Sequence, residues 1–216
     1  TRTLTLDYDG YEIAVDTGFI VFNRPNYPHL TELFTYLGVP VHKSEMSCAA
    51  SIGRGWLEWG AGDLNAVLGQ RRNLLRPRFA LLVRDVLRFN TQAQGAVARH
   101  PEFNLDELLT HLGLGDWFRR FYLLPMAGAI WSCPLSDMLS FPASTLVRFF
   151  ANHNLLSVTG QHQWYTVTGG AQEYVQRLMA PFSHRIRTSC GAVAISRRDG
   201  KVHIRDTHSE TSVYDQ

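Results

Sequence analysis

The sequence predicts an α+β fold in which sheet pieces at both ends of the chain, mixed or antiparallel, flank a large and mainly helical block. Three observations predict it. Strand-like alternation with glycine turns fills residues 1–22 and 185–215, helical spacing of apolar residues fills most of 64–156, and no internal repeat is present. We expect the two strand regions to lie together in one sheet region, apart from the helical block.

The N-terminal part is predicted to contain two hairpins and one helix. Residues 1–22 alternate as a hairpin that turns at Asp9-Gly10. Apolar residues at helical spacing predict a helix within 26–38, and a second hairpin follows within 45–60.

The middle of the chain carries the helical pattern. Pro77 suits the first turn of a long helix that runs to about residue 98. Asn104 is a suitable N-cap for the next helix, which Gly113 ends. Further helices are expected over residues 64–68, 116–131 and 142–156.

After residue 160 the pattern returns to strands. A strand over 162–167 is followed by a glycine-led helix over 169–182 and by short strands over 185–215 that turn at Asp199-Gly200.

Composition excludes several classes of protein. With 216 residues, 45% hydrophobic, the chain is long enough to bury a substantial core. A formal charge of +2 gives no reason to expect nucleic acid binding. Three cysteines that are odd in number and far apart, and histidines without ligand spacing, predict no metal site and a reducing compartment. No apolar leader or span is visible, so we expect a cytoplasmic protein.

The triplet Asp16-Thr17-Gly18 follows a strand, as the catalytic triplet of an aspartic protease does. Such enzymes need two facing carboxylates, and this sequence has one Asp-Thr-Gly, so only a homodimer could use it. A turn at the end of a strand is the simpler interpretation. The sequence contains neither a G-x-S-x-G elbow nor a complete G-x-G-x-x-G turn.

The stretch from Arg71 to Arg88 mixes arginines with apolar residues at helical spacing. It could bind the surface of an anionic membrane, which would place the protein at the periphery of the inner membrane face. Alternatively it packs its apolar side inward and exposes its arginines to water.

Six segments, taken in order, carry a resemblance to a known family: AVDTGFIVFN, EMSC, RRNLLRPRF, YLLPMAGAIWSCP, FPASTLVRFFANHNLL and WYTVTGGAQEYVQRL. They resemble the bacterial proteins usually described as predicted NAD/FAD-binding proteins. These belong to the flavoprotein superfamily of amine oxidases, protoporphyrinogen oxidases and phytoene desaturases. The resemblance covers nearly the whole chain, which has neither the family's N-terminal Rossmann-type unit nor its C-terminal segment. We therefore expect a middle fragment of such an enzyme.

The resemblance implies residues that support FAD. Asp16, Thr17 and Gly18 resemble a turn near the flavin ring, Gly169-Gly170 a turn on the flavin side, and Ala192 lies in a strand like the one that meets the adenine. Residues 1–34 and 160–216 are then sheet pieces beside the flavin site, and 35–159 a helical substrate domain. FAD is expected to bind the complete protein and not this chain alone, which is expected to be inactive and to self-associate.

The chemistry that the resemblance implies is hydride transfer from a C–H bond of a small apolar substrate, either amine-like or lipid-like, to the flavin. No catalytic residue is predicted. Five aromatic residues could line the substrate pocket or belong to the core: Trp56, Trp59, Tyr122, Trp131 and Trp164. The alternative from another class is a non-catalytic module that binds a lipid or a protein partner.

Overall fold

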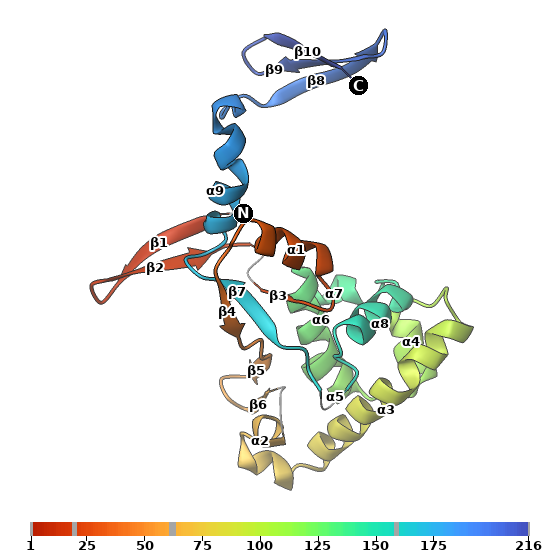
Figure 1. Ribbon diagram of the computed structural model, residues 1–216. Coiled ribbons are helices and arrows are strands. Elements are labelled where there is room, and N and C mark those ends of the chain that lie inside the picture. The colour runs from red at the N-terminus through yellow and green to blue at the C-terminus, as the bar shows by residue number, and fades with distance from the viewer. Residues whose placement is uncertain (1, 19–20, 61–63, 158–159, 216) are drawn as a thin grey trace.

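The structure, a computed structural model, describes residues 2–18, 21–60, 64–157 and 160–215. A body of helices and small sheets carries two projections, a hairpin near the N-terminus and a sheet near the C-terminus (Figure 1). The elements are mixed α and β with antiparallel pairing, as the sequence predicts.

The N-terminal projection is a two-stranded sheet. Strands β1 (Thr3–Tyr8) and β2 (Tyr11–Asp16) pair along their full length, with Thr3 opposite Asp16. The turn lies at Asp9 and Gly10, where φ is 52° and 82°. Positive φ at both positions matches the right-handed twist of a tight hairpin, so the predicted turn is confirmed.

A three-stranded sheet forms the centre of the body. Strand β7 (Trp164–Val167) lies between β3 (Phe22–Asn23) and β4 (Val41–Ser44), antiparallel to both. Helix α1 (Pro28–Tyr36) buries Phe34 against Phe22 of this sheet, with ring centroids 5.2 Å apart. Strand β4 was not predicted, because four residues without a glycine boundary give little strand signal.

The second predicted hairpin is confirmed as β5 (Ala49–Ile52) and β6 (Leu57–Gly60). Leu57 and Trp59 are buried with Phe79 in a small core. This core joins the hairpin to the helical block.

Residues 64–156 form helices, as predicted. They are α2 (Leu64–Val67), η1 (Arg71–Leu75), α3 (Pro77–Arg99), α4 (Leu105–His111), α5 (Asp116–Phe118), η2 (Arg119–Leu123), α6 (Leu124–Trp131), α7 (Leu135–Met138) and α8 (Ala143–Asn152). Their facing sides enclose the largest core, in which Phe89, Phe118 and Phe150 are almost completely buried.

Local sequence accounts for the ends of these helices. Asn104 caps α4 through a reciprocal pair of hydrogen bonds with Glu107, and Pro77 begins α3. Residues 116–131, predicted as one helix, contain a π-helical segment in the middle. Helix α7 lies between the predicted helices 116–131 and 142–156, where no helix was predicted.

The C-terminal projection begins with α9 (Gln172–Met179) and η3 (Ala180–Arg185) and ends in a sheet of β8 (Ala192–Arg198), β9 (Lys201–Asp206) and β10 (Thr211–Asp215). The expectation that this sheet joins the N-terminal strands was wrong. The two sheets lie toward opposite ends of α9 (Figure 1), because a helix of 8 residues is a rigid spacer of about 12 Å.

The predicted domain boundaries, 1–34 with 160–216 against 35–159, stay a prediction. Strand β4 comes from the middle segment but pairs with β7.

Within the described residues, no helix has both the length and the apolar character needed to cross a bilayer.

Candidate functional site

Asp16 joins two segments that are far apart in the sequence. Both oxygens of its carboxylate accept a hydrogen bond from the backbone N–H of Ala171, at 3.0 and 2.9 Å. Thr3 donates its hydroxyl to Oδ1 of Asp16 at 2.5 Å, and accepts from the backbone N–H of Gln172 at 3.1 Å. A carboxylate at the first N–H groups of α9 is favourable, because those groups lack partners within the helix.

The two glycines before α9 are explained by their backbone conformation and, at Gly170, by the lack of space for a side chain. Gly169 and Gly170 have φ of 85° and 87°, in the region that favours glycine. A Cβ on Gly170 would lie 2.6 Å from Cγ2 of Thr3. Gly170 therefore allows the backbone before α9 to pass close to the first strand of the hairpin.

The structure thus brings together five of the six predicted cofactor residues at one corner. Asp16 and Gly170 are its inner layer, whereas Thr17, Gly18 and Gly169 are exposed. Ala192 is not part of it. It lies on β8 opposite Asp206, in the separate C-terminal sheet (Figure 1).

The exposed rim of this corner suits a flat ring better than a phosphate. Apart from its neighbours in the chain, no atom of the described residues lies within 4 Å of the position that a Cβ on Gly18 would occupy. The N-terminus of α9 is already occupied by Asp16, and is therefore not available to a phosphate. The corner fits a supporting contact to a flavin, and that contact stays a prediction.

The five predicted pocket aromatics form two groups. Trp59 and Tyr122 contact each other with ring centroids 4.9 Å apart, and Trp56 lies near them against Phe121 at 5.7 Å. Nε1 of Trp59 donates to the carbonyl of Phe121 at 2.7 Å. These contacts make Trp59 part of the small core under β6.

Trp131 and Trp164 belong to a different aromatic chain. Trp131 contacts Phe149 at 5.0 Å, Phe149 stacks on His153 at 4.0 Å, and His153 stacks on Trp164 at 5.9 Å. Nδ1 of His153 lies 3.0 Å from the carbonyl oxygen of Phe149, whereas its buried Nε2 has no hydrogen-bond partner among the described residues. This second group connects α6 and α8 to β7.

Burial shifts the acidity of two groups near the first aromatic cluster. Burial, with a smaller contribution from Cys48, raises the pKa of Tyr122 to about 12. Burial also raises the pKa of the Cys48 thiol. Both groups therefore stay protonated at neutral pH, and neither is prepared to act as a base or nucleophile.

The structure contains an open cavity beside Trp59. It measures about 430 Å³, within the range of small-molecule sites. Its walls come from β5, β6, α2 and the segment between α2 and η1: Ala49, Ala50, Ser51, Glu58, Trp59, Gly60, Ala66, Gly69 and Gln70. Ser51 donates to Oε1 of the exposed Glu58 at 2.8 Å. Trp59 is the one residue of this set that was predicted for the site, because small residues in a hairpin carry no motif.

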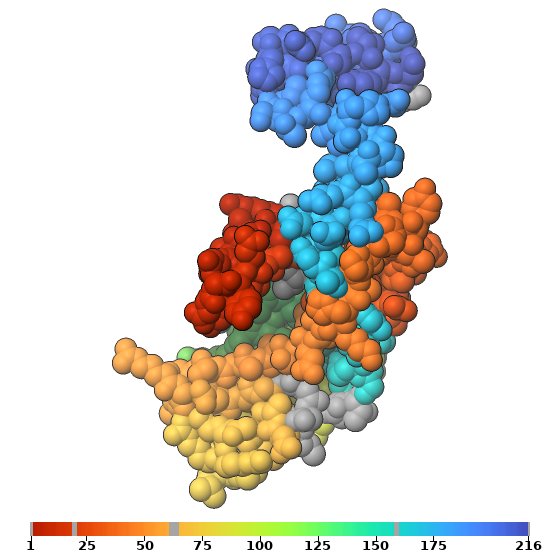
Figure 2. All heavy atoms as spheres, turned by 60° about the vertical axis from the view of Figure 1, so that its left-hand side comes forward, coloured from red at the N-terminus to blue at the C-terminus, as the bar shows by residue number. Residues whose placement is uncertain are grey.

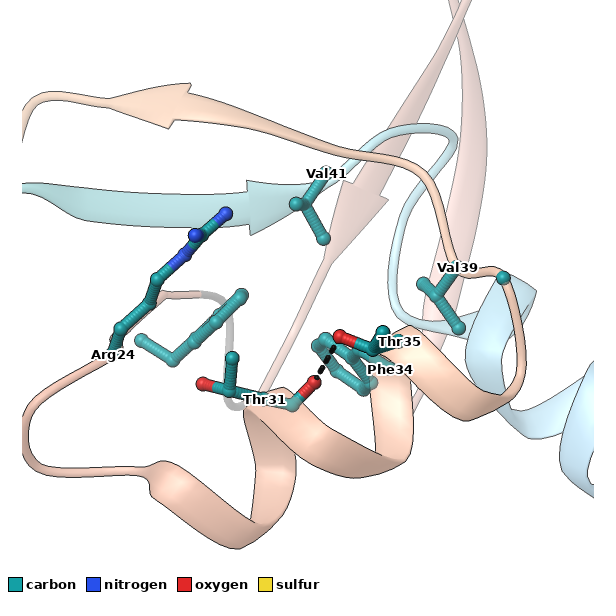
Figure 3. A pocket seen from close by; sticks show the side chains of 8 residues that line it. Arg24, Thr31, Phe34, Thr35, Val39 and Val41 are labelled. Atoms are coloured by element: carbon teal, nitrogen blue, oxygen red, sulfur yellow. Dashed lines mark hydrogen bonds between the residues drawn. The ribbon is translucent and has the colours of Figure 1, made fainter.

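A second hollow lies between α1 and the central sheet (Figure 3). It measures about 120 Å³, which is too small for most substrates. Arg24 and Val41 lie on one side, and Thr31, Phe34 and Thr35 line the helix side, where the Thr35 hydroxyl donates to the carbonyl of Thr31 (Figure 3). We assign it no ligand.

Comparison with known proteins defines the class. The family model for flavin containing amine oxidoreductases matches residues 2–216, so this chain belongs to that family. No curated protein sequence gives a significant match.

Solved structures resemble the chain in fold. A triple mutant of putrescine oxidase matches with a TM-score of 0.63 at 15% identity over 98% of this chain, and a double mutant with 0.62 at 16% over 98%. A fatty acid isomerase from P. acnes, described as CLA-producing, matches with a TM-score of 0.53 at 16% identity over 97%. The chain spans 48%, 48% and 47% of these structures, about half their length.

Proposed function

We propose that this chain is the substrate-domain part of an FAD-dependent oxidoreductase that oxidises or desaturates a C–H bond of an apolar, amine-like or lipid-like substrate. The observation that carries the proposal is the flavin-family match over residues 2–216. When bound, the flavin would supply the hydride acceptor. The chain would supply the walls that position the substrate and exclude water.

The cavity beside Trp59 is our candidate for the binding site of that substrate. Ala49, Ala50, Ala66 and the indole of Trp59 offer apolar surface. The carboxylate of Glu58, held by Ser51, would orient an ammonium group at the cavity wall. This geometry suits an amine with an apolar chain.

The Asp16 corner would support the cofactor and not the chemistry. Its carboxylate already accepts hydrogen bonds from Ala171 and Thr3, so it holds the hairpin against α9. This structural role and the family membership both favour the flavoprotein over the dimeric aspartic protease.

The test uses the complete gene product. We expect a flavin absorbance spectrum, and under anaerobic conditions we expect a substrate to bleach it. Addition of alkylamines and of unsaturated fatty acids in separate experiments distinguishes the two substrate classes. Glu58→Gln should raise the KM of an amine about tenfold and leave that of a fatty acid unchanged, because it removes only the charge. A protein without flavin would instead support the non-catalytic binding module.

A matched titration uses the 216-residue chain alone. We expect it not to bind FAD with useful affinity, because the N-terminus of α9 is occupied by Asp16. Micromolar binding by isothermal titration calorimetry would show that the cofactor grip lies within these residues.

A further inference from the structure

The turn η1 presents an apolar and basic surface at one end of the molecule. Leu74 is 63% exposed and Leu75 is 86% exposed. We define the η1 surface as these two leucines with Trp56, Arg71, Arg72 and Arg78. The segment around η1, yellow in Figure 2, lies at the end of the molecule opposite to the sheet β8–β10.

The apolar residues within 71–88 lie in two different environments, some buried and some exposed. Phe79 and Leu82 are buried, so the apolar side of α3 packs into the protein. The leucines of η1, in contrast, are exposed to solvent. The sequence does not distinguish the two sets, because both follow the same helical spacing.

The outward position of Leu74 and Leu75 is fixed by Asn73. Asn73 is completely buried, donates from Nδ2 to the carbonyl of Glu58 at 2.8 Å, and accepts at Oδ1 from Arg76 at 3.1 Å. Because Asn73 points inward, the next two side chains of the tight turn point away from the body. The exposed leucines are therefore held in place by the fold.

The charge around this turn has one sign. Residues 64–91 contain six arginines and a single acidic residue, Asp85. Asp85 is buried, where it accepts from Arg84 and from the backbone N–H of Gly115. Among described residues, none of the other five arginines of the stretch forms an ion pair. Their positive charge is available to a partner.

An exposed tryptophan lies at the edge of the same surface. Trp56 is 43% exposed, and the guanidinium of Arg76 lies 5.1 Å from its ring centroid. Tryptophan, arginine and leucine together are the side chains that occupy the interface between water and lipid.

We propose that the η1 surface binds the protein to an anionic lipid bilayer. Leu74 and Leu75 would enter the boundary of the acyl chains, and Arg71, Arg72 and Arg78 would contact lipid phosphates. A second copy of the chain is a poor occupant, because it would place arginines against arginines. The inference does not depend on the proposed reaction.

The experiment measures co-sedimentation of the complete protein with vesicles. We expect binding to vesicles that contain phosphatidylglycerol, little binding to pure phosphatidylcholine, and loss of binding at high salt. The double variant Leu74→Ser with Leu75→Ser should weaken binding at least tenfold. Arg71→Gln with Arg78→Gln should weaken binding to anionic vesicles only.

Matched controls come from the opposite end of the molecule. Val193→Ser with Ile195→Ser and Arg197→Gln with Arg198→Gln change residues on β8 that are also exposed, and should bind like the unaltered protein. Far-UV circular dichroism checks that each variant folds. Equal binding by the η1 variants and the unaltered protein, or no vesicle binding at all, would overturn the proposal, and retention by an acidic protein alone would assign the surface to a protein partner.

A second measurement does not depend on the leucine variants. Brominated lipids quench a tryptophan that enters the bilayer, so the fluorescence of the bound protein should fall, and Trp56→Phe should remove most of that fall. Quenching unaffected by Trp56→Phe would contradict the proposed orientation.

Discussion

The helical block and the two projecting sheets bury their apolar residues very differently. In the block, the side chains of α3, α4, α6 and α8 enclose a core with many residues fully buried. In the projections, Leu6, Ile13, Val193 and Ile195 are exposed by 42–66%. Helices can cover one another's apolar stripes, whereas a small sheet needs another layer on its face. The stability of this chain should therefore reside in the block.

This difference in burial is reflected in the shape of the molecule. The β8–β10 sheet extends away from the rest on the narrow neck formed by α9 and η3 (Figure 2), and Figure 1 shows the hairpin projecting from the body. A two-stranded hairpin is at best marginally stable alone. The hairpin here is held by the Asp16 corner, where it meets α9.

The largest expected effect comes from a core residue of the block. Phe118 is fully buried and its ring lies 5.5 Å from Phe89. Phe118→Ala should lower the free energy of unfolding by about 3–5 kcal/mol, because it removes buried apolar surface and leaves a cavity. Urea denaturation followed by circular dichroism measures it. Tyr11→Ala on the hairpin, where Tyr11 is 74% exposed, is the matched control and should cost under about 0.5 kcal/mol.

The second prediction uses pH to probe the same block. Tyr122 has a pKa of about 12 in the folded protein, above its ordinary value of 10.0. The folded state holds the proton more tightly, so the contribution of Tyr122 is complete below pH 10.0 and is lost as the pH rises to about 12. The loss should be roughly 2–3 kcal/mol.

The pH dependence of the urea midpoint measures this effect. Tyr122→Phe should show a shallower decline above pH 10.0, since it has no proton to lose. An unchanged decline in the variant would mean that other groups, such as the Cys48 thiol, cause the alkaline loss.

Much of this contrast could be predicted from the sequence, and some could not. The turn at Asp9-Gly10, the cap at Asn104 and the start of α3 at Pro77 depend on local chemistry, and each was predicted correctly. The separation of the two sheets depends on the direction of α9, which no local pattern reports. The meeting of Asp16 with Gly170 spans more than 150 residues, and only the family resemblance placed both near one site.

The third prediction tests the corner that holds the hairpin to the body. Gly170→Ala should cost about 1–3 kcal/mol, because alanine is strained at φ 87° and its Cβ would lie 2.6 Å from Cγ2 of Thr3. Gly10→Ala has a similar φ of 82° but nothing within 4 Å, so it should show the backbone strain alone.

The double variant Thr3→Ser with Gly170→Ala isolates the steric part of the loss of stability. Thr3→Ser removes Cγ2 and keeps the hydroxyl that Asp16 accepts from, so it should reduce the cost of Gly170→Ala toward that of Gly10→Ala. Thermal unfolding of the unaltered chain, the three single variants and the double variant gives the comparison. Equal costs for Gly170→Ala and Gly10→Ala would show that the close approach to Thr3 does not constrain the hairpin.

The smallest effect on stability is expected in the C-terminal sheet, where the contrast with the block is greatest. Val193 and Ile195 are exposed by 57% and 66%, so Val193→Ser with Ile195→Ser removes almost no buried contact. The free energy of unfolding should change by less than about 0.5 kcal/mol. The same exposed apolar side chains should promote self-association of the 216-residue chain, because water is released when such surfaces meet. Sedimentation velocity at several concentrations should therefore show self-association of the unaltered chain and less of it in the double variant, whereas Leu87→Ser, at an exposed leucine on α3, should leave it unchanged. If the double variant unfolds as readily as Phe118→Ala, the C-terminal sheet shares the stability of the block and the contrast between the two regions is wrong.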